Sequence, residues 1–396
     1  MDLILKQAKE LQPRLLPLFE ELHRHPELSF DEVRTTRFLR KVLEDLGLEI
    51  LDLPVETGLA ALLKGSGSGG LVGLRADLDA VVVQEHPDHN PCSETPGVMH
   101  ACGHDYHMTC ALGAAMLLSE RKPGGDVALI FQPAEEITRG AAAMLEQGLL
   151  ERLPGKMRAL FALHAEPRLP AGQVISSRSY ASAAKTNFRI RLTGTVGHSG
   201  SPQSYQDVIP AGAALIQGVQ NLVSRQSDPQ KALVCAIHTI QAGELEFFVT
   251  DQMVMSGTMR AFDEELLKGT IERLRKLVQG VAETYGCSGQ VEIIPEVPAQ
   301  LNHPDLYPAA RQACLQIFGQ ENTMESEPLF MGAEDFALFG ARIPSHFYWI
   351  GTGFPDRPNA SQHQPAFQIN PQAIPYGVAL LVSSIRFMQD IIQGKE

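Results

Sequence analysis

The chain has 396 residues, of which 44% are hydrophobic and 20% are charged, and its formal net charge at pH 7 is −13. This composition is typical of a soluble globular protein with a sizeable core, and the length suggests two or three domains. The acidic balance argues against nucleic acid or an anionic membrane as the main partner. It leaves open small acidic substrates, which need only a local cationic pocket.

The first part of the chain alternates helices and strands. Apolar spacing predicts a helix over 4–23 and a second helix from a cap at Asp31 to about Leu46. Strands are then expected at 58–65, 71–76, 126–131 and 157–164, with helices at 106–120 and 137–149. Because such alternation is typical of parallel sheets, we predict an α/β fold, with a mostly parallel-sheet catalytic domain and helices on both faces.

The order of elements changes to β-α-β-β-α-β between residues 185 and 294. Strands are expected at 186–194, 233–243, 253–262 and 290–297, and helices at 207–226 and 263–285. This order predicts an α+β unit of the ferredoxin-like type. The α/β pattern then resumes with helix 304–318, strand 346–353 and helix 371–392. We therefore assign 1–184 and 295–396 to the catalytic domain and 185–294 to an inserted domain.

Three of the predicted strands end in ionisable residues. Asp77 and Asp79 follow one strand, Glu135 and Glu136 follow another, and His164 closes a third. Parallel sheets bind ligands at the carboxyl ends of their strands, so these residues are expected to form one constellation.

The segment from His100 to His107 reads HACGHDYH, which places a thiol, three imidazoles and a carboxylate close together. In an extended chain, positions i and i+2 point the same way, so Cys102 and His104 can reach one metal or two neighbouring metals. Alone, the pair could as easily be a buried structural thiol and a loop histidine. Beside the glutamates and His164, metal ligation is the better interpretation.

Glu135 and Glu136 are neighbours, and an extended chain would send them in different directions. One could then bind a metal while the other accepts a proton from water. The alternative is an exposed acidic loop or a helix N-terminus, where glutamates suit the dipole. After a buried strand and beside a candidate metal site, we favour the functional interpretation.

Other histidines say little by themselves. His198 lies in a glycine-rich turn and His363 in the segment SQHQPAF. We interpret the following as ordinary surface or packing residues: His23, His25, His86, His89, His238, His303 and His346. The six cysteines form no CxxC pair, which fits a reducing compartment. With no signal peptide and no long apolar stretch, we expect a cytoplasmic protein that does not span a membrane.

Taken together, the segments resemble the metal-dependent N-acyl-amino-acid amidohydrolases. This group includes hippurate hydrolases, aminoacylases and auxin-conjugate hydrolases, and it is related to dinuclear-metal carboxypeptidases. The matching pieces are LHRHPELSF (22–30), RADLDA (75–80), PGVMHACGHDYHMT (96–109), FQPAEE (131–136), GHSGSP (197–202), SGTMR (256–260) and GAEDF (332–336). They cover nearly the whole chain, and HACGHD and FQPAEE are highly specific in this order and spacing.

The resemblance implies hydrolysis of the amide bond of N-acyl amino acids by a homodimer joined through an inserted lid domain. It implies two divalent metal ions (zinc, manganese, cobalt or nickel) and a general base, Glu135. The implied metal ligands are Cys102, His104, Glu136, His164 and His363. Asp79 would orient a ligand, His198 would reach the partner's active site, and Arg260 would meet the substrate carboxylate.

The chain departs from the family pattern in its lid, where Gln203 stands at a usual histidine and Phe247 near a usual asparagine. These departures leave the substrate open. One alternative is a dipeptidase or carboxypeptidase with the same chemistry. Another is a metal-containing binding protein without activity, although an intact Glu135 beside an intact ligand set argues against it.

Overall fold

The computed structural model describes residues 2–326 and 331–394. The chain folds into two compact units. The first comprises Met1–Ala181, Gln300–Leu329 and Asp335–Glu396, and the second comprises Ser182–Ala299 and Phe330–Glu334. Within the described residues, no helix has both the length and the apolar character needed to cross a membrane.

The first unit is built on a sheet whose described strands follow the order β1-β2-β4-β3-β5-β14-β6-β13. These are β1 (Glu49–Ile50), β2 (Leu59–Leu63), β3 (Leu71–Asp77), β4 (Val127–Gln132), β5 (Met157–Pro170), β6 (Val174–Ile175), β13 (Thr323–Met324) and β14 (Ser345–Gly353). The central strands β4, β3, β5 and β14 run parallel, whereas β1, β2 and β4 pair antiparallel at one side. The predicted α/β fold with a mostly parallel central sheet is confirmed. The short strands β7 (Tyr180–Ser182) and β12 (Gln300–Leu301) form a separate pair.

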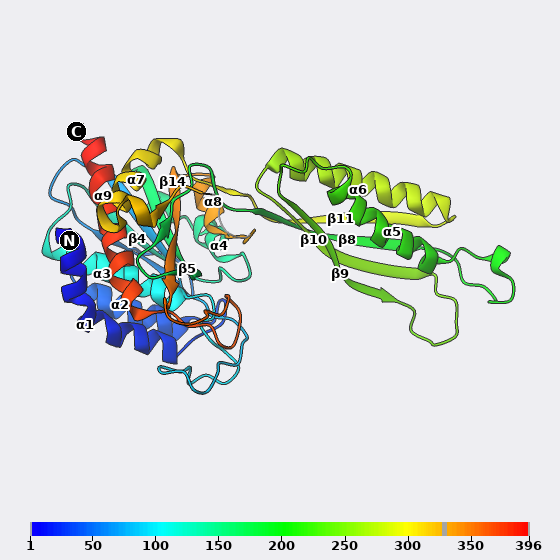
Figure 1. Cartoon of the computed structure of the whole chain (residues 1–396), viewed down its shortest axis with the longest axis horizontal. Coiled ribbons are helices and arrows are strands. Elements are labelled where there is room, and N and C mark those ends of the chain that lie inside the picture. Colours follow the sequence, from blue (N-terminus) through cyan, green and yellow to red (C-terminus); the bar gives the residue numbers. More distant parts are fainter. Residues whose placement is uncertain (1, 327–330, 395–396) are drawn as a thin grey trace. The chain divides into compact units, whose positions relative to one another are not determined.

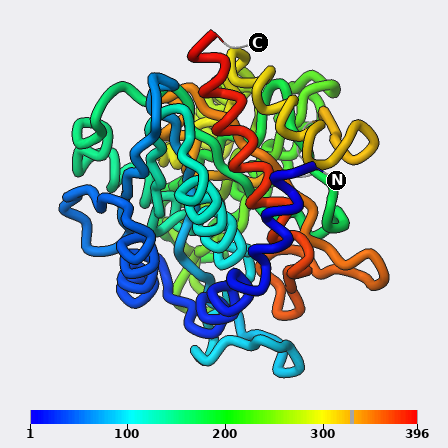
Figure 2. Tube along the Cα trace, turned by 90° about the vertical axis from the view of Figure 1, so that its left-hand side faces the viewer, coloured from blue at the N-terminus to red at the C-terminus, as the bar shows by residue number. Residues whose placement is uncertain are grey.

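Helices cover both faces of this sheet (Figure 1). They are α1 (Leu3–Arg24), α2 (Val33–Asp45), α3 (His104–Glu120), α4 (Gly140–Glu146), α7 (Tyr307–Phe318), α8 (Phe336–Gly340) and α9 (Ile374–Ile392). Helices α3 and α9 pack against β3, and α1 lies against both of them, as Figure 2 shows in cyan, red and blue. Helix α3 is buried on all sides from His104 to Leu118, so the candidate ligand His104 begins a rigid core element.

The second unit has its own sheet, helices and apolar core. Its described elements are β8 (Ala184–Thr193), α5 (Val208–Ser224), β9 (Leu233–Ala242), β10 (Gln252–Ala261), α6 (Glu264–Thr284) and β11 (Ser288–Val297). The strand order is β11-β8-β10-β9, and each neighbouring pair is antiparallel. Alternate residues of β8, such as Phe188, Ile190 and Leu192, are buried with α5 and α6.

Three local expectations are wrong. Helix α2 begins after Glu32, so Asp31 is not its cap. Strand β5 continues to Pro170, which places His164 inside the strand rather than at its end. The helix expected over 137–149 is restricted to Gly140–Glu146, because the chain first makes a turn in which Thr138 has a φ of 56°.

Candidate metal centre

A left-handed glycine brings Cys102 and His104 together. Gly103 has a φ of 84° and caps the start of α3. A Cβ at this position would lie 2.9 Å from the Cβ of Ala165, and the conformation itself disfavours other residues. The expected extended geometry is therefore wrong, because a tight turn aims both side chains. The ligand atoms of Cys102, His104 and His164 all lie within 4.8 Å of one another.

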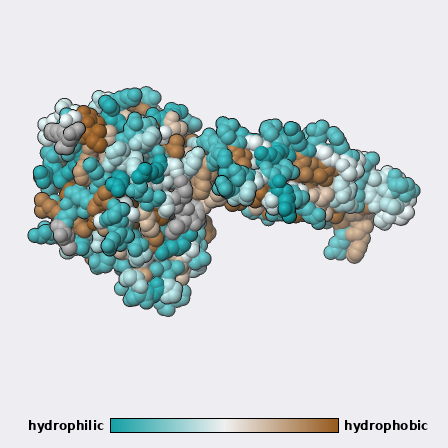
Figure 3. All heavy atoms as spheres, turned by 45° about the horizontal axis from the view of Figure 1, so that its top comes forward, coloured by the Kyte–Doolittle hydropathy of each residue, from teal (hydrophilic) through white to brown (hydrophobic). Residues whose placement is uncertain are grey.

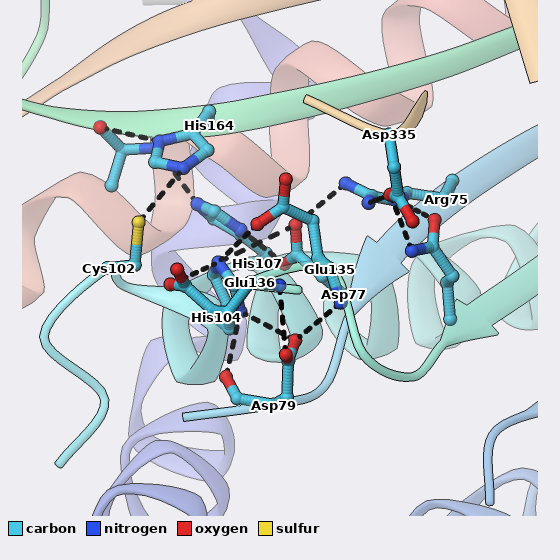
Figure 4. Close-up of polar contacts among 12 residues, drawn as sticks. Arg75, Asp77, Asp79, Cys102, His104, His107, Glu135, Glu136, His164 and Asp335 are labelled. Atoms are coloured by element: carbon cyan, nitrogen blue, oxygen red, sulfur yellow. Dashed lines mark hydrogen bonds and ion pairs between the residues drawn. The ribbon is translucent and has the colours of Figure 1, made fainter. Parts of the chain in front are cut away.

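His104 is held so that one ring nitrogen faces a group of carboxylates (Figure 4). Its Nδ1 donates to the backbone carbonyl of Asp79 at 2.8 Å. Its Nε2 lies 3.8 Å from Oε1 of Glu136 and 4.0 Å from Oε2 of Glu135. Burial lowers the pKa of His104, but the charge of Asp77 and the hydrogen bond with Asp79 outweigh it and raise the pKa to about 10. Such a concentration of negative charge favours a bound cation.

Glu135 and Glu136 lie in a turn after β4, not in an extended chain. Ala134, just before them, has a φ of 51°. The backbone N–H of Glu135 donates to Oδ1 of Asp79 at 3.0 Å, and that of Glu136 donates to Oδ2 of Asp79 at 3.0 Å. One carboxylate thus orients both glutamates. The expectation that they diverge is wrong, since both carboxylates come within 4.8 Å of the His104 ligand atom.

His164 approaches Cys102 from β5. Its Nδ1 donates to the carbonyl of Ala165 at 2.8 Å, and its Nε2 lies 3.4 Å from Sγ of Cys102. Its ring lies 4.8 Å from that of Trp349, centroid to centroid. Burial lowers the pKa of His164, which favours the neutral imidazole that binds metals. Burial, reinforced by Glu136 and Glu135, raises the pKa of Cys102, so a thiolate here needs a cation beside it.

His363 joins the cluster from far along the chain. It has a φ of 61°, and its backbone N–H donates to the carbonyl of Ala101 at 2.8 Å. Its Nε2 lies 3.3 Å from Oε1 of Glu136. Cys102, Glu136 and His363 form a second donor group within 4.8 Å. The His363 side chain is 50% exposed, so the cluster is open to solvent at this point.

Sequence reasoning missed a buried network behind these donors (Figure 4). Asp77 accepts from Nη1 of Arg75 at 2.7 Å and from Nδ1 of His107 at 2.6 Å. Nη2 of Arg75 also donates to Asp335 at 3.2 Å. Nε2 of His107 accepts from the backbone N–H of Ala165 at 2.9 Å, beside His164. Arg75, Asp77, His107 and Asp335 lie in the matching segments named above, but nothing in the sequence distinguishes a supporting residue from a ligand.

His23 is not the ordinary residue that we expected. It is buried between two carboxylates, with Nδ1 2.7 Å from Asp105 and Nε2 2.9 Å from Glu85. Although burial lowers its pKa, hydrogen bonds to Asp105 and Glu85 raise it to about 10. Nothing in the sequence clearly indicates this contact, because Glu85 is 62 positions away from His23.

Two predicted residues belong to the second unit. His198 is exposed, and its Nδ1 accepts from the backbone N–H of Gly200 at 3.0 Å. Arg260 lies on β10 and donates from Nη1 to the carbonyl of Met331 at 2.7 Å. Burial lowers the pKa of Arg260. Of the departures from the family pattern, Phe247 has a φ of 69° and is 96% exposed.

The donors of the first unit suit divalent metal ions. They combine a thiol, imidazoles and carboxylates, a set that binds zinc and other first-row transition metals. Among the residues that the structure describes, Nε2 of His104 is buried without a hydrogen-bond partner, although a buried polar nitrogen normally has one. The donor groups share Cys102, His104 and Glu136, so they form one continuous cluster.

Comparisons with known proteins agree with this chemistry. The chain is 37% identical over 369 residues to N-acetylcysteine deacetylase of Bacillus subtilis, covering 92% of this chain and 94% of the relative. It is 33% identical over 391 residues to IAA-amino acid hydrolase ILR1-like 2 of Arabidopsis thaliana, covering 97% and 87%. The crystal structure of the Bacillus subtilis YXEP protein, described as a dinuclear metal binding peptidase from the M20 family, matches with a TM-score of 0.85 and 34% identity over 97% of this chain and 99% of that one. Residues 73–386 match the model of peptidase family M20/M25/M40, and the chain belongs to that family.

Proposed function

We propose that this chain is a metal-dependent amidohydrolase that cleaves N-acyl amino acids into a carboxylic acid and a free amino acid. Two relatives are named for hydrolysis of such compounds. The observation that carries the proposal is the buried donor cluster around Cys102, His104 and Glu136, with the carboxylate of Glu135 beside it.

We assign two divalent metal ions to five side chains of the first unit. These are Cys102, His104, Glu136, His164 and His363. When bound, the ions supply Lewis-acid chemistry, which makes water more acidic and polarises the scissile carbonyl. The donor set suits zinc, manganese, cobalt or nickel. The relative of known structure is described as dinuclear, which supports the number of ions.

The protein's own residues transfer the proton and bind the substrate. Glu135 takes a proton from water at its carboxylate and returns it to the leaving nitrogen. Asp79 keeps Glu135 and His104 in place through the contacts described above. In the proposed homodimer, His198 of one chain donates to the oxygen that becomes negative in the active site of its partner, and the fork of Arg260 binds the substrate carboxylate. The second unit thereby acts as a lid on the catalytic unit.

We also propose that the second unit joins two chains into a homodimer. Strand β9 is at the edge of its sheet, where unpaired backbone groups favour pairing. The hairpin from β9 to β10 exposes Leu245, Phe247 and Phe248. Figure 3 shows hydrophobic atoms, in brown, on the projection that this hairpin forms. Light scattering of the full chain is expected to give the mass of two chains, and a monomer at micromolar concentration would contradict the proposal.

A cytoplasmic location is also proposed. All six cysteines are free, which suits a reducing compartment. Cys102 must stay reduced, because oxidation would remove a metal ligand.

A substrate panel tests the proposed reaction. The metal-free protein is reconstituted with zinc or manganese and assayed with acetyl-, benzoyl- and long-chain acyl-amino acids and with dipeptides. Release of amino acid from an acyl compound supports the proposal. Cleavage of dipeptides alone would favour the peptidase alternative. The description of the Bacillus subtilis YXEP protein as a peptidase supports that alternative. No release from any compound would overturn both.

A further inference from the structure

The segment Leu22–Glu32 comprises the end of α1 and its connection to α2, and it contains the motif LHRHPELSF, to which the proposed reaction assigns no role. Three of its side chains each contact a different piece of the candidate metal centre. Its backbone is tied to the same region, because the N–H of Ala80 donates to the carbonyl of Glu27 at 2.8 Å. The segment is therefore placed to influence the centre without reaching the reacting atoms.

Glu32 holds the turn that carries the two glutamates. Its side chain is fully buried, and its Oε1 accepts from the backbone N–H of Ala134 at 2.8 Å. The next two N–H groups, of Glu135 and Glu136, donate to Asp79. Three consecutive N–H groups, the first from Ala134 with a φ of 51°, thus donate to buried carboxyl groups. These hydrogen bonds hold the turn in its shape, because a buried N–H without an acceptor is costly.

Ser29 fixes the carboxylate on which the glutamates depend. Its Oγ donates to Oδ2 of Asp79 at 2.6 Å, the same oxygen that accepts from the N–H of Glu136. Asp79 is 1% exposed, so water cannot replace this hydrogen bond easily. The hydroxyl restricts rotation of the carboxylate and keeps both of its oxygens aimed at the turn.

His23 anchors the start of α3. It contacts Asp105, which follows His104 and also accepts from the backbone N–H of Tyr106 at 2.8 Å. The same segment therefore contacts three parts of the centre. These are the start of α3, the carboxylate of Asp79 and the turn that carries Glu135 and Glu136.

We propose that Glu32 and Ser29 are positioning residues for this centre, and that the segment Leu22–Glu32 acts as a frame that sets the orientation of Glu135 and Glu136. Both residues act through others, Glu32 through Ala134 and Ser29 through Asp79. The inference rests on the proposed function, because it assigns the glutamates their roles.

The test compares Glu32→Leu with Glu32→Gln and with Asp31→Asn. Leucine removes the acceptor for the Ala134 N–H, glutamine keeps an oxygen there, and Asp31 is an exposed neighbour whose substitution removes a carboxylate without touching the turn. Glu32→Leu is expected to lower kcat and metal affinity about 10- to 100-fold, as loss of supporting contacts in metal sites typically does. KM should stay near the wild-type value, because substrate contacts are unchanged. Glu32→Gln should recover most of the loss, and Asp31→Asn should match the wild type.

Metal affinity is measured by titrating the metal-free full chain with zinc against a chromophoric chelator, and kcat and KM with the best substrate of the panel. Wild-type affinity and kcat in Glu32→Leu, or equal losses in Glu32→Gln and Glu32→Leu, would overturn the inference. If Glu32→Leu does not fold, Ser29→Ala is compared with Ser29→Thr. Alanine removes the hydroxyl that donates to Asp79, whereas threonine keeps a hydroxyl. Absence of hydrolysis in the wild type would instead count against the proposed function. The metal titration would still test whether the segment Leu22–Glu32 positions the metal-binding residues.

Discussion

Glu135 and Glu136 are adjacent and share one orienting carboxylate, yet their surroundings differ. Both glutamates share one donor group with His104, but Glu136 also lies with the proposed ligands Cys102 and His363, whereas Glu135 also lies with Glu334 and Asp335, which are not proposed ligands. A carboxylate shared between metal donors on two sides is a poor proton acceptor. The positions of the other donors therefore support the proposed roles, which are coordination for Glu136 and proton transfer for Glu135.

The first prediction follows from this difference. Glu135→Gln keeps the size of the side chain but cannot take up a proton, so it should lower kcat by a factor on the order of 100 to 10,000 while the protein still binds two ions. Elemental analysis and steady-state kinetics measure the two quantities. Glu136→Gln is the matched control and should lose metal as well as activity. A Glu135→Gln enzyme with the wild-type rate would refute the assignment.

At the scale of secondary-structure elements, His23 joins the end of α1, the start of α3 and the segment around Glu85. Its imidazole lies between Asp105 and Glu85, and all three side chains are buried. A buried charge that loses its partner destabilises a fold by about 3–5 kcal/mol, so these elements depend on one another.

The second prediction concerns pH and unfolding. The pKa of His23 rises from 6.5 to about 10 in the folded chain. Its contribution to the free energy of unfolding is therefore complete below pH 6.5 and is lost as the pH rises through about 10. Metal-free wild type should lose more stability in urea between pH 7 and 10 than His23→Gln does. His25→Gln, at a partly exposed neighbour, should follow the wild type, and identical slopes in all three would contradict the prediction.

The main strands of the first unit and its mostly parallel sheet could be predicted, because apolar runs that alternate with helical segments are typical of parallel sheets. The order of the strands within the sheet was not predicted. The local shape of the site could not. Ala134 and His363 adopt positive φ angles of 51° and 61°, which sequence rules reserve for glycine. Hydrogen bonds between residues far apart in the sequence hold these turns, since the N–H of Ala134 donates to Glu32 and that of His363 donates to the carbonyl of Ala101. The residues that meet were predictable, whereas the turns that bring them together depend on contacts far apart in the sequence.

At the scale of the whole molecule, the proposed ligands come from α3, the turn after β4, strand β5 and the segment around His363. Bound ions would thus connect parts of the first unit that are distant in the sequence. The second unit has a separate apolar core and supplies none of the five proposed ligands. Metal binding should therefore stabilise one unit and not the other.

The third prediction tests this difference by calorimetry. Removing metal with a chelator should lower the melting temperature of the first unit, because an ion at a thousand times its Kd stabilises the folded state by about 4 kcal/mol. Adding zinc back should restore it. The transition of the second unit serves as an internal control and should not move. An unchanged thermogram after complete metal removal would contradict the ligand assignment.

The hydrogen bonds of His107 decide whether its ring can bind a metal ion. Because its Nε2 accepts from the Ala165 N–H, its proton must sit on Nδ1, where it donates to Asp77. This imidazole has no lone pair left to offer, although it stands among good donors with Asp77 and His104. A cation could bind this ring only by displacing one of the two hydrogen bonds, so His107 supports the site and is not itself a proposed ligand.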